Sequence, residues 1–377
     1  MARPETIAEL AEIVASATEP FDLRGLGTKA KLGRIPSGEI LDLSAFSGII
    51  KYEPEELVLE VGSATKLADV EKLLAEHNQM LAFEPPDLSS LLGTLNSGTM
   101  GGLLACNLSG PRRMKAGAAR DHVLGLSAVS GRGETFKTGA HVVKNVTGYD
   151  LPKLMAGSYG TLAAFTSVIL KVMPKPEAQT TLQLECASDH EALALMTKAM
   201  QSPHEISGAA YQPGQGVMLR VEGIAPSVAF RTKALAQMLG AKCEIMDEES
   251  SAKIWQGLRD VKCFADTSTR SVWKISLPPQ DAPGFIEILK PHLEFRYAFD
   301  WAGGLVWLDH EPKASGHLVR SALKSGHAML FRADEETRNA EDVFSPQPAP
   351  LAALTQRVKR AFDPKGLFNP GRMVKGH

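Results

Sequence analysis

A short loop near the N-terminus combines two glycines with two cationic side chains. It reads Arg24-Gly-Leu-Gly-Thr-Lys29 and follows residues 21–23, which are typical of a short strand. Closely spaced glycines let the backbone approach a pyrophosphate, and their N–H groups can form an anion-binding nest. The third glycine of the dinucleotide fingerprint is missing, because Ala30 occupies its position, and the P-loop sequence is absent as well. The loop therefore indicates either a phosphate site of another kind or an ordinary strand–turn.

A second stretch is richer still in small residues. Residues 93–102 read Gly-Thr-Leu-Asn-Ser-Gly-Thr-Met-Gly-Gly, and Asn107-Leu-Ser-Gly110 follows shortly afterwards. A chain of this kind can lie flat against a planar ligand and donate backbone hydrogen bonds to it. The alternative is a disordered Gly/Ser linker. Leu103, Leu104 and Leu108 argue against a linker, because they are spaced as in a buried helix.

The elements that must position these loops can be read from the periodicity of the apolar residues. We expect an opening helix over residues 4–18 and a hairpin over 48–61, and then a helix capped by Ser63. A polar loop spans residues 85–117, and loops of this length in compact domains usually serve function. Further on, helices are predicted over residues 185–202, 226–240, 282–290 and 349–362.

Composition narrows the class of protein. The chain has 377 residues, of which 44% are hydrophobic, and a net charge of −2, so it lacks the basic footprint of a nucleic-acid-binding protein. Its four cysteines never form a C-x-x-C pair, which excludes a sequence-local zinc or iron–sulfur site. Few thiols suit a reducing compartment, and no apolar run is long enough to span a bilayer. We expect a cytoplasmic protein whose attachment to a membrane through partners is left open.

The two glycine-rich stretches, taken together with two later ones, resemble the FAD-binding domain of the vanillyl-alcohol oxidase family, also called the p-cresol methylhydroxylase type. The first loop looks like the pyrophosphate loop of that family, and Thr99-Met-Gly-Gly102 to Ser109-Gly110 looks like its second flavin-binding stretch. The third flavin-binding stretch of the family is matched by Thr147-Gly-Tyr-Asp-Leu151 together with Gly157-Ser-Tyr-Gly-Thr-Leu162. Asn369-Pro-Gly371 matches near the end of the chain.

Within this family the pattern is most similar to the FAD-binding subunits of bacterial glycolate oxidases (glycolate dehydrogenases). The stretches that point to them are Lys144-Asn-Val-Thr-Gly-Tyr-Asp150, Ser109-Gly-Pro-Arg-Arg113 and Phe368-Asn-Pro-Gly-Arg-Met373. Pro174 and Pro176 mark a boundary, since prolines at close spacing stop regular structure. The implied fold class is α+β. It comprises a two-subdomain FAD-binding domain of the p-cresol methylhydroxylase type (1–176), a smaller α+β cap domain on the substrate side (177–348), and a C-terminal helix and tail that return to the FAD domain (349–377).

The resemblance also implies which residues surround the cofactor. These are Gly25, Leu26, Gly27, Thr28, Lys29, Pro85, Thr99, Met100, Gly101, Gly102, Asn107, Ser109, Gly110, Arg120, Asp121, Gly160, Leu162 and Asn369. Members of the family with covalent flavin often carry a histidine in the first loop, as Gly-Gly-His. Thr28 and Lys29 follow Gly27 here, so this loop offers no such nucleophile and FAD is expected to bind non-covalently.

The substrate side departs from relatives that oxidise 2-hydroxy acids. Those relatives commonly carry a histidine-rich motif that binds a metal, and this chain lacks it. The spacing of His310, His317 and His327 does not match that of two metal ligands on one helix or strand. No metal site is therefore expected. His327 is the candidate general base on an alcohol, and a structural histidine is the alternative. The segment Trp301-Ala-Gly-Gly-Leu-Val-Trp307 alternates like a strand with bulky faces.

Three functions compete. The first is an FAD-binding subunit of a glycolate oxidase complex, oxidising glycolate to glyoxylate and passing electrons to a partner. The resemblance implies a second flavin subunit and an iron–sulfur subunit as partners, with a small hydroxy acid as substrate. The second is a self-sufficient FAD-dependent 2-hydroxy-acid dehydrogenase. The third is a non-catalytic scaffold, against which the glycines argue, because a chain with no ligand to approach could carry larger residues at many of these positions.

Overall fold

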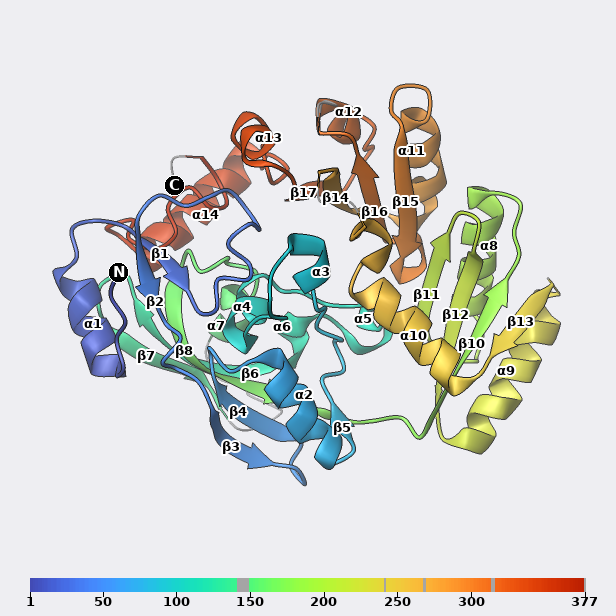
Figure 1. Ribbon diagram of the computed structural model, residues 1–377, viewed down its shortest axis with the longest axis horizontal. Helices are drawn as coiled ribbons and strands as arrows, with labels where there is room; N and C mark the ends of the chain where they lie inside the picture. Colours follow the sequence, from blue (N-terminus) through green and yellow to red (C-terminus); the bar gives the residue numbers. More distant parts are fainter. Residues whose placement is uncertain (141–148, 241, 267–268, 313–315, 376–377) are drawn as a thin grey trace. The chain divides into compact units, whose positions relative to one another are not determined.

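The computed structural model describes residues 1–140, 149–240, 242–266, 269–312 and 316–375. The chain forms two compact units, neither of which is one continuous stretch of sequence (Figure 1). Unit 1 consists of Met1–Leu108, Gly117–Pro174 and Pro346–His377, and unit 2 consists of Ser109–Ala116 and Lys175–Ser345. The chain therefore passes between the units at four places, and residues 109–116 are a short excursion of the polypeptide into unit 2.

Unit 1 is built on β-sheet. Its strands are β1 (Phe21–Arg24), β2 (Glu39–Asp42), β3 (Ile49–Glu53), β4 (Val58–Gly62), β5 (Gln79–Met80), β6 (Val123–Ser130), β7 (Thr135–Gly139), β8 (Ala163–Lys171) and β9 (Met173–Pro174). Its helices are α1 (Ile7–Ser16), α2 (Leu67–Glu76), α3 (Ser89–Leu92), α4 (Met100–Ala105), α6 (Ala119–His122), α7 (Leu151–Met155) and α14 (Ala349–Phe362). β1 and β2 form a parallel pair, β5 and β9 an antiparallel pair, and the main antiparallel sheet has the order β3-β4-β8-β6-β7.

Helix α1 packs on the parallel strand pair. The Thr6 side chain accepts a hydrogen bond from the N–H of Glu9, so the helix begins at Ile7 rather than at residue 4. Leu10 and Val14, four residues apart on one face, are fully buried in a cluster that includes Phe368. Burying such a side chain stabilises a fold by roughly 1.5–3 kcal/mol. This small core fixes the position of β1, from whose end the glycine loop departs.

The main sheet of unit 1 is centred on β8, which is buried along all but its last residue. It lies between β4 and β6, with Val168 opposite both Val61 and Leu126. The connection after β4 differs from expectation, because Ser63 does not cap the next helix. The Ser63 hydroxyl donates to the carbonyl of Phe165 at 2.6 Å, and α2 starts only at Leu67. Ser63 thus links the ends of two neighbouring strands.

Unit 2 is an eight-stranded antiparallel sheet in the order β13-β10-β12-β11-β15-β16-β14-β17. Its strands are β10 (Ala178–Leu184), β11 (Ile206–Gln212), β12 (Gly216–Gly223), β13 (Cys243–Met246), β14 (Ser271–Ser276), β15 (Phe295–Asp300), β16 (Leu305–His310) and β17 (His327–Arg332). Its helices are α5 (Arg113–Ala116), α8 (Asp189–Met200), α9 (Ala225–Leu239), α10 (Glu248–Arg259), α11 (Ala282–Leu289), α12 (Gly316–Ser321) and α13 (Glu335–Ala340). Three 3₁₀ turns, η1 (Lys262–Phe264), η2 (Pro279–Asp281) and η3 (Trp301–Gly303), complete it.

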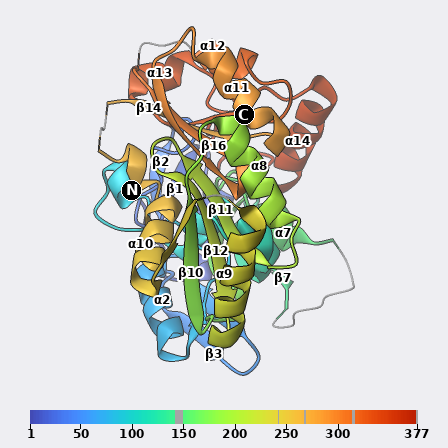
Figure 2. The same cartoon turned by 90° about the vertical axis from the view of Figure 1, so that its right-hand side faces the viewer.

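The two faces of the unit 2 sheet carry different helices. α8 and α9 pack together over β12, and α10 lies on the opposite side of the strands (Figure 2). Trp255 of α10 donates to the Thr181 hydroxyl at 2.8 Å and lies so close to Gly208 that a Cβ there would be 2.7 Å from its ring. Strand register places Arg220 opposite Thr181, so Arg220 and Glu222 share the α10 face.

One strand expectation in unit 2 is wrong. β16 begins only at Leu305, and the residues before it form η3, a tight turn. Trp301, Ala302 and Gly303 have positive φ values of 52°, 53° and 94°, which no strand can accommodate. Among the residues that the structure describes, no helix is long and apolar enough to cross a lipid bilayer.

Candidate functional site

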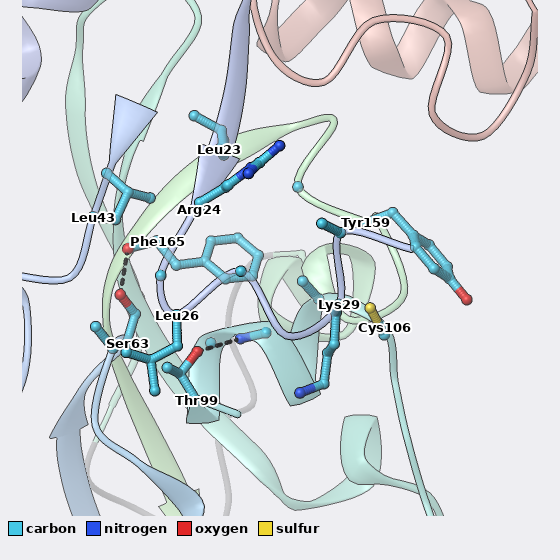
Figure 3. Close-up of a pocket in the computed structure, with 18 of the residues that line it drawn as sticks. Leu23, Arg24, Leu26, Lys29, Leu43, Ser63, Thr99, Cys106, Tyr159 and Phe165 are labelled. Carbon is cyan, nitrogen blue, oxygen red and sulfur yellow. Dashed lines mark hydrogen bonds between the residues drawn. The ribbon is translucent and has the colours of Figure 1, made fainter. Parts of the chain in front are cut away.

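A pocket in unit 1 opens where β1 ends (Figure 3). Its empty space is ≈ 720 Å³ with the solvent-open mouth included. The lining residues are Leu23, Arg24, Gly25, Leu26, Gly27, Thr28, Lys29, Ala30, Leu43, Ser63, Ala64, Thr99, Gly101, Gly102, Ala105, Cys106, Tyr159, Gly160, Ala163, Phe165, Asn369 and Arg372. Segments far apart in the sequence therefore meet around one space.

Lys29 is the charged centre of this pocket. Its side chain is buried, and its Nζ makes two long hydrogen bonds to described residues, at 3.5 Å to the Thr28 hydroxyl and 3.4 Å to the Ser97 carbonyl. Burial lowers the pKa of Lys29, although Cys106 and Asp87 act to raise it. Within the described part of the chain, no carboxylate forms an ion pair with this ammonium group. Because an unpaired buried cation is costly, the pocket is suited to an anionic ligand.

Thr99 and the glycines of α4 form the opposite wall. Thr99 caps α4, and its hydroxyl accepts from the N–H of Gly102 at 3.3 Å. The N–H of Gly101 donates to the Ser63 carbonyl at 2.7 Å, and a Cβ on Gly101 would lie 2.8 Å from the Cβ of Ser63. Gly101 is therefore required by packing between two parts of the chain, whatever the ligand.

Asn369 closes the pocket from the C-terminal tail. Its side-chain oxygen accepts from the N–H of Leu23 at 2.8 Å, and its amide nitrogen donates to the Tyr159 carbonyl at 2.8 Å. A Cβ on Gly160, whose φ is +70°, would lie 2.7 Å from that nitrogen. Arg372 donates to the Lys29 carbonyl at 2.6 Å. The tail thus holds the ends of the first and third glycine stretches together.

These contacts give some of the glycines a structural role. A glycine implies a ligand only where a larger residue would otherwise fit. At Gly101 and Gly160 the protein's own atoms already forbid a side chain. The buried charge of Lys29, rather than the glycines, is the feature that argues for an anionic ligand and against an empty scaffold.

The structure brings together ten of the residues predicted to surround the cofactor. Lining the pocket are Gly25, Leu26, Gly27, Thr28, Lys29, Thr99, Gly101, Gly102, Gly160 and Asn369. Outside its lining lie Pro85, Met100, Asn107, Ser109, Gly110, Arg120, Asp121 and Leu162. The roles of both sets in binding stay predictions.

Several residues outside the pocket lining have identified contacts of their own. Asn107 accepts from the N–H of Arg120 at 3.0 Å, and Asp121 accepts from the N–H of Ala118 at 2.9 Å. Ser109 and Gly110 belong to unit 2. Residues 144–148 of the Lys144-to-Asp150 motif lie outside the described residues.

Sequence reasoning missed four notable lining residues, namely Cys106, Tyr159, Phe165 and Arg372. Figure 3 shows the buried Cys106 thiol beside Lys29. Burial raises the pKa of Tyr159 well above its usual value, with Cys106 adding to the rise and Arg372 opposing it, so the phenol stays protonated. Arg372 directly follows the Asn-Pro-Gly motif, which was the one available signal for it.

The candidate base, His327, lies in unit 2 as the first residue of β17. Its partial burial and the positive charges of Lys274 and Arg113 lower its pKa. The nearby candidate His310 is buried, with one ring nitrogen accepting from Trp273 at 2.8 Å and the other 2.6 Å from the Glu311 carbonyl. In the part of the chain that the structure describes, no three His, Cys, Asp or Glu side chains are grouped to hold a metal ion.

Comparison with known proteins places this fold in the class of FAD-dependent oxidoreductases of the p-cresol methylhydroxylase type. Residues 1–139 match the family described as an FAD binding domain. A solved alkyldihydroxyacetonephosphate synthase has the same fold, with a TM-score of 0.68 at 14% identity over 98% of this chain and 76% of that chain.

Relatives of known name narrow the class. The chain is 36% identical to glycolate oxidase subunit GlcE of Escherichia coli (strain K12) over 371 residues, 98% of this chain and 97% of that protein. It is 34% identical to glycolate oxidase subunit GlcD of Bacillus subtilis (strain 168) over 184 residues, 48% of this chain and 38% of that protein. The chain therefore belongs to the family of the glycolate oxidase subunit GlcE. The fold class and family predicted from the sequence are confirmed.

Proposed function

We propose that this chain is the FAD-binding subunit of a glycolate oxidase complex, which oxidises glycolate to glyoxylate and passes the electrons to a partner. The observation that carries the proposal is the similarity to GlcE, because it runs through 98% of this chain and so includes both units. The partners would be a second flavin subunit similar to GlcD and an iron–sulfur subunit, since the chain has no cluster motif. We place the complex in the cytoplasm, and any attachment to a membrane would be made through its partners.

The pocket of unit 1 would hold the FAD. The buried Lys29 fits its diphosphate, which would supply the negative charge that no described side chain provides as an ion pair. Thr28, Thr99 and the backbone of the glycine loop would donate further hydrogen bonds. Bound flavin supplies a two-electron acceptor, and the protein supplies position and electrostatics. We propose that the cofactor is not covalently linked, because Thr28 stands where covalent relatives carry histidine.

His327 would accept the hydroxyl proton of the substrate on a ring nitrogen. A general base must be unprotonated at working pH, and the cations beside His327 favour its neutral form. A histidine that is only structural remains the alternative. Exchange of His327 for glutamine separates the two, because a structural histidine would leave turnover of the assembled complex close to that of the parent.

The first test is an absorbance spectrum of the purified chain before and after acid precipitation. Flavin in the acid supernatant supports dissociable FAD, whereas flavin in the pellet shows a covalent bond. The Cys106 thiol lines the pocket and is the control position. If flavin stays in the pellet with the parent chain and moves to the supernatant with Cys106→Ala, the non-covalent proposal is wrong and the attachment site is known.

A second test adds glycolate without oxygen, first to the chain alone and then to the chain co-expressed with its GlcD-like partner. Bleaching of the flavin only with the partner supports the subunit of a complex. Bleaching of the chain alone favours the self-sufficient 2-hydroxy-acid dehydrogenase. If the chain binds no FAD under any condition, both catalytic functions are ruled out and the non-catalytic scaffold is the function that remains.

A further inference from the structure

The side chains of Arg113 and Lys274, from separate parts of unit 2, meet at the ring of Trp301. The Arg113 guanidinium carbon lies 4.3 Å from the centre of the Trp301 ring, and the Lys274 ammonium lies 5.3 Å from the same ring. Lys274 also lies 5.7 Å from the ring of Trp307. Cation–π contacts attract each cation to the indole, but the two cations repel one another. A negatively charged group of a ligand, bound close to both cations, would reduce this repulsion.

The strand register places these groups on one face of the sheet. Lys274 of β14 lies opposite Trp307 of β16 and Met329 of β17, and Ser276 lies opposite His327. Side chains two residues apart on a strand share a face, so His327 lies on the same face as Lys274. The electrostatic influence of Lys274 and Arg113 on His327 agrees with this placement.

Arg113 reaches the sheet because residues 109–116 are anchored in unit 2. Arg112 makes two hydrogen bonds to the Glu222 carboxylate, at 2.6 and 3.0 Å, and Lys115 pairs with Glu205 at 3.1 Å. The indole N–H of Trp301 donates to the Gly110 carbonyl at 3.1 Å. Arg113 is thus held over a ring that is itself fixed to the same segment.

The backbone at Trp301 adds an independent sign of function. Trp301 and Ala302 are consecutive residues other than glycine with φ of +52° and +53°, a conformation that such residues rarely adopt. Strained backbone of this kind persists where the surrounding structure enforces it, and it gathers at ligand-binding sites. Here the strained turn carries the indole that both Arg113 and Lys274 contact.

Three acidic side chains of unit 2 have arginine or backbone partners of their own. Asp309 pairs with Arg296 and Arg270, and Asp266 also pairs with Arg296. Asp300, buried at the end of β15, accepts from the N–H of Trp301 at 2.7 Å.

We propose that Arg113 and Lys274, with the Trp301 ring as a wall, bind the carboxylate of a small hydroxy acid or 2-oxo acid in unit 2. Guanidinium and ammonium groups are the side chains that recognise carboxylates, and the indole covers a short carbon chain. His327 would then lie on the side of the bound acid that carries the hydroxyl. Only the identity of the acid rests on the proposed function.

The test is binding of oxalate, glycolate and acetate to the FAD-loaded full chain at constant ionic strength, followed by calorimetry and tryptophan fluorescence. Chloride and sulfate are the reference anions. Arg113→Gln and Lys274→Gln are each expected to raise the dissociation constant of oxalate about tenfold or more, as loss of a charge-assisted hydrogen bond does. Arg113→Lys, which keeps the charge, should retain most of the affinity and shows that the position tolerates exchange.

Lys115→Gln is the matched control, because Lys115 lies two residues from Arg113 on the same short helix but pairs with Glu205 at the surface. It should bind oxalate like the parent. Trp301→Phe should remove most of the fluorescence response. Binding no tighter than that of sulfate, or equal loss in Lys115→Gln and Arg113→Gln, would overturn the proposal.

The same variants separate this inference from the proposed function. If oxalate binding depends on Arg113 and Lys274 while the assembled complex oxidises no glycolate, the carboxylate site stands and the glycolate oxidase assignment fails. If the complex oxidises glycolate with an unchanged KM in both glutamine variants, the assignment stands and the carboxylate site is refuted.

Discussion

Two of the buried cations, Arg220 in unit 2 and Lys29 in unit 1, have opposite surroundings. Arg220 in unit 2 is 1% exposed, donates to the Ser207 hydroxyl at 3.1 Å and lies 3.6 Å from the Glu222 carboxylate. Its guanidinium also covers the Trp255 ring at 4.5 Å. Lys29 in unit 1 is 8% exposed and has two long hydrogen bonds to neutral oxygens.

The difference shows how to tell a structural charge from a binding charge. Burial alone would raise the pKa of Glu222, but Arg220 and Arg112 hold it at about 2, so Glu222 is an ionised buried partner of both arginines. No described carboxylate forms such a pair with Lys29, and the pocket around it is open. A buried cation that the protein does not neutralise is a candidate for ligand binding.

The largest effect is expected at Glu222. Glu222→Gln leaves Arg112 and Arg220 without their buried partner and should lower the free energy of unfolding of unit 2 by about 3 kcal/mol. The chain's tryptophans all lie in unit 2, so fluorescence during urea unfolding reports on that unit. Because the pKa of Glu222 falls from 4.5 to about 2 on folding, its contribution is present above pH 4.5 and is lost as pH falls toward 2.

Two further observations bear on this prediction. The stabilities of the parent and Glu222→Gln should converge as pH approaches 2, and a constant gap would contradict the ion-pair explanation. Glu205→Gln is the control, since the Glu205–Lys115 pair is exposed and its loss should cost less than about 1 kcal/mol.

The second largest effect is expected at Lys29, the buried cation without a described ion-pair partner. Lys29→Met keeps the size of the side chain but removes its charge, so FAD affinity should fall by a factor of roughly 10–100, about 2 kcal/mol. The apo protein should be as stable as the parent or more so, because an unpaired buried charge is removed. Fluorescence titration with FAD and thermal unfolding of the apo protein measure the two changes.

Lys31→Met is the control for that experiment, because Lys31 is exposed two residues further on and does not line the pocket. It should leave FAD affinity unchanged. A Lys29→Met apo protein much less stable than the parent would show that Lys29 is structural, and the contrast with Arg220 would disappear.

A smaller effect is expected at Asn369. Asn369→Ala leaves the N–H of Leu23 and the carbonyl of Tyr159 without their partner, and should cost unit 1 about 1.5 kcal/mol. Hydrogen exchange of the Leu23 amide should become faster. Asn369→Asp keeps an acceptor for Leu23 and should be affected less at that amide. Unchanged exchange in the alanine variant would mean that the tail does not hold the loop in solution.

The smallest effect is a change in the titration of His327. Burial lowers the pKa of His327 first, and Lys274 and Arg113 lower it further. Lys274→Gln removes one positive charge, so the protonated imidazole becomes less unfavourable and the pKa should rise. The pKa of His327 is measured by following its ring-proton resonance by NMR as pH is changed. The control is Lys115→Gln, in which this pKa should not change. A pKa that falls or stays fixed would place Lys274 too far from His327 for the carboxylate site.

Regular elements with strong local patterns could be predicted from the sequence. The expected helix over residues 349–362 is α14, and those over 185–202, 226–240 and 282–290 are α8, α9 and α11 with slightly different ends. Local signals explain this, such as Ser188 capping α8 and Gly240 ending α9 in a left-handed conformation. α10 was missed, because its apolar residues are few and its surface is polar.

Contacts between distant residues could not be predicted in this way. Nothing near Arg112 indicates that its partner, Glu222, lies 110 residues away, so the excursion of residues 109–116 into unit 2 was invisible. The glycine stretches did identify the first loop and the N-terminal part of α4 as pocket walls. Cys106 and Tyr159 were missed because only the folded chain brings their side chains to the first loop.

The closing of the pocket by Asn369 and Arg372 has a consequence for biosynthesis. Asn369 lies 346 residues after Leu23, and Arg372 lies 343 residues after Lys29. Since a nascent chain emerges from its N-terminus, the glycine loop leaves the ribosome long before the two residues that hold it. Capture of FAD should therefore wait until Asn369 and Arg372 have left the ribosome, and products that terminate before these residues should remain colourless and open to proteases.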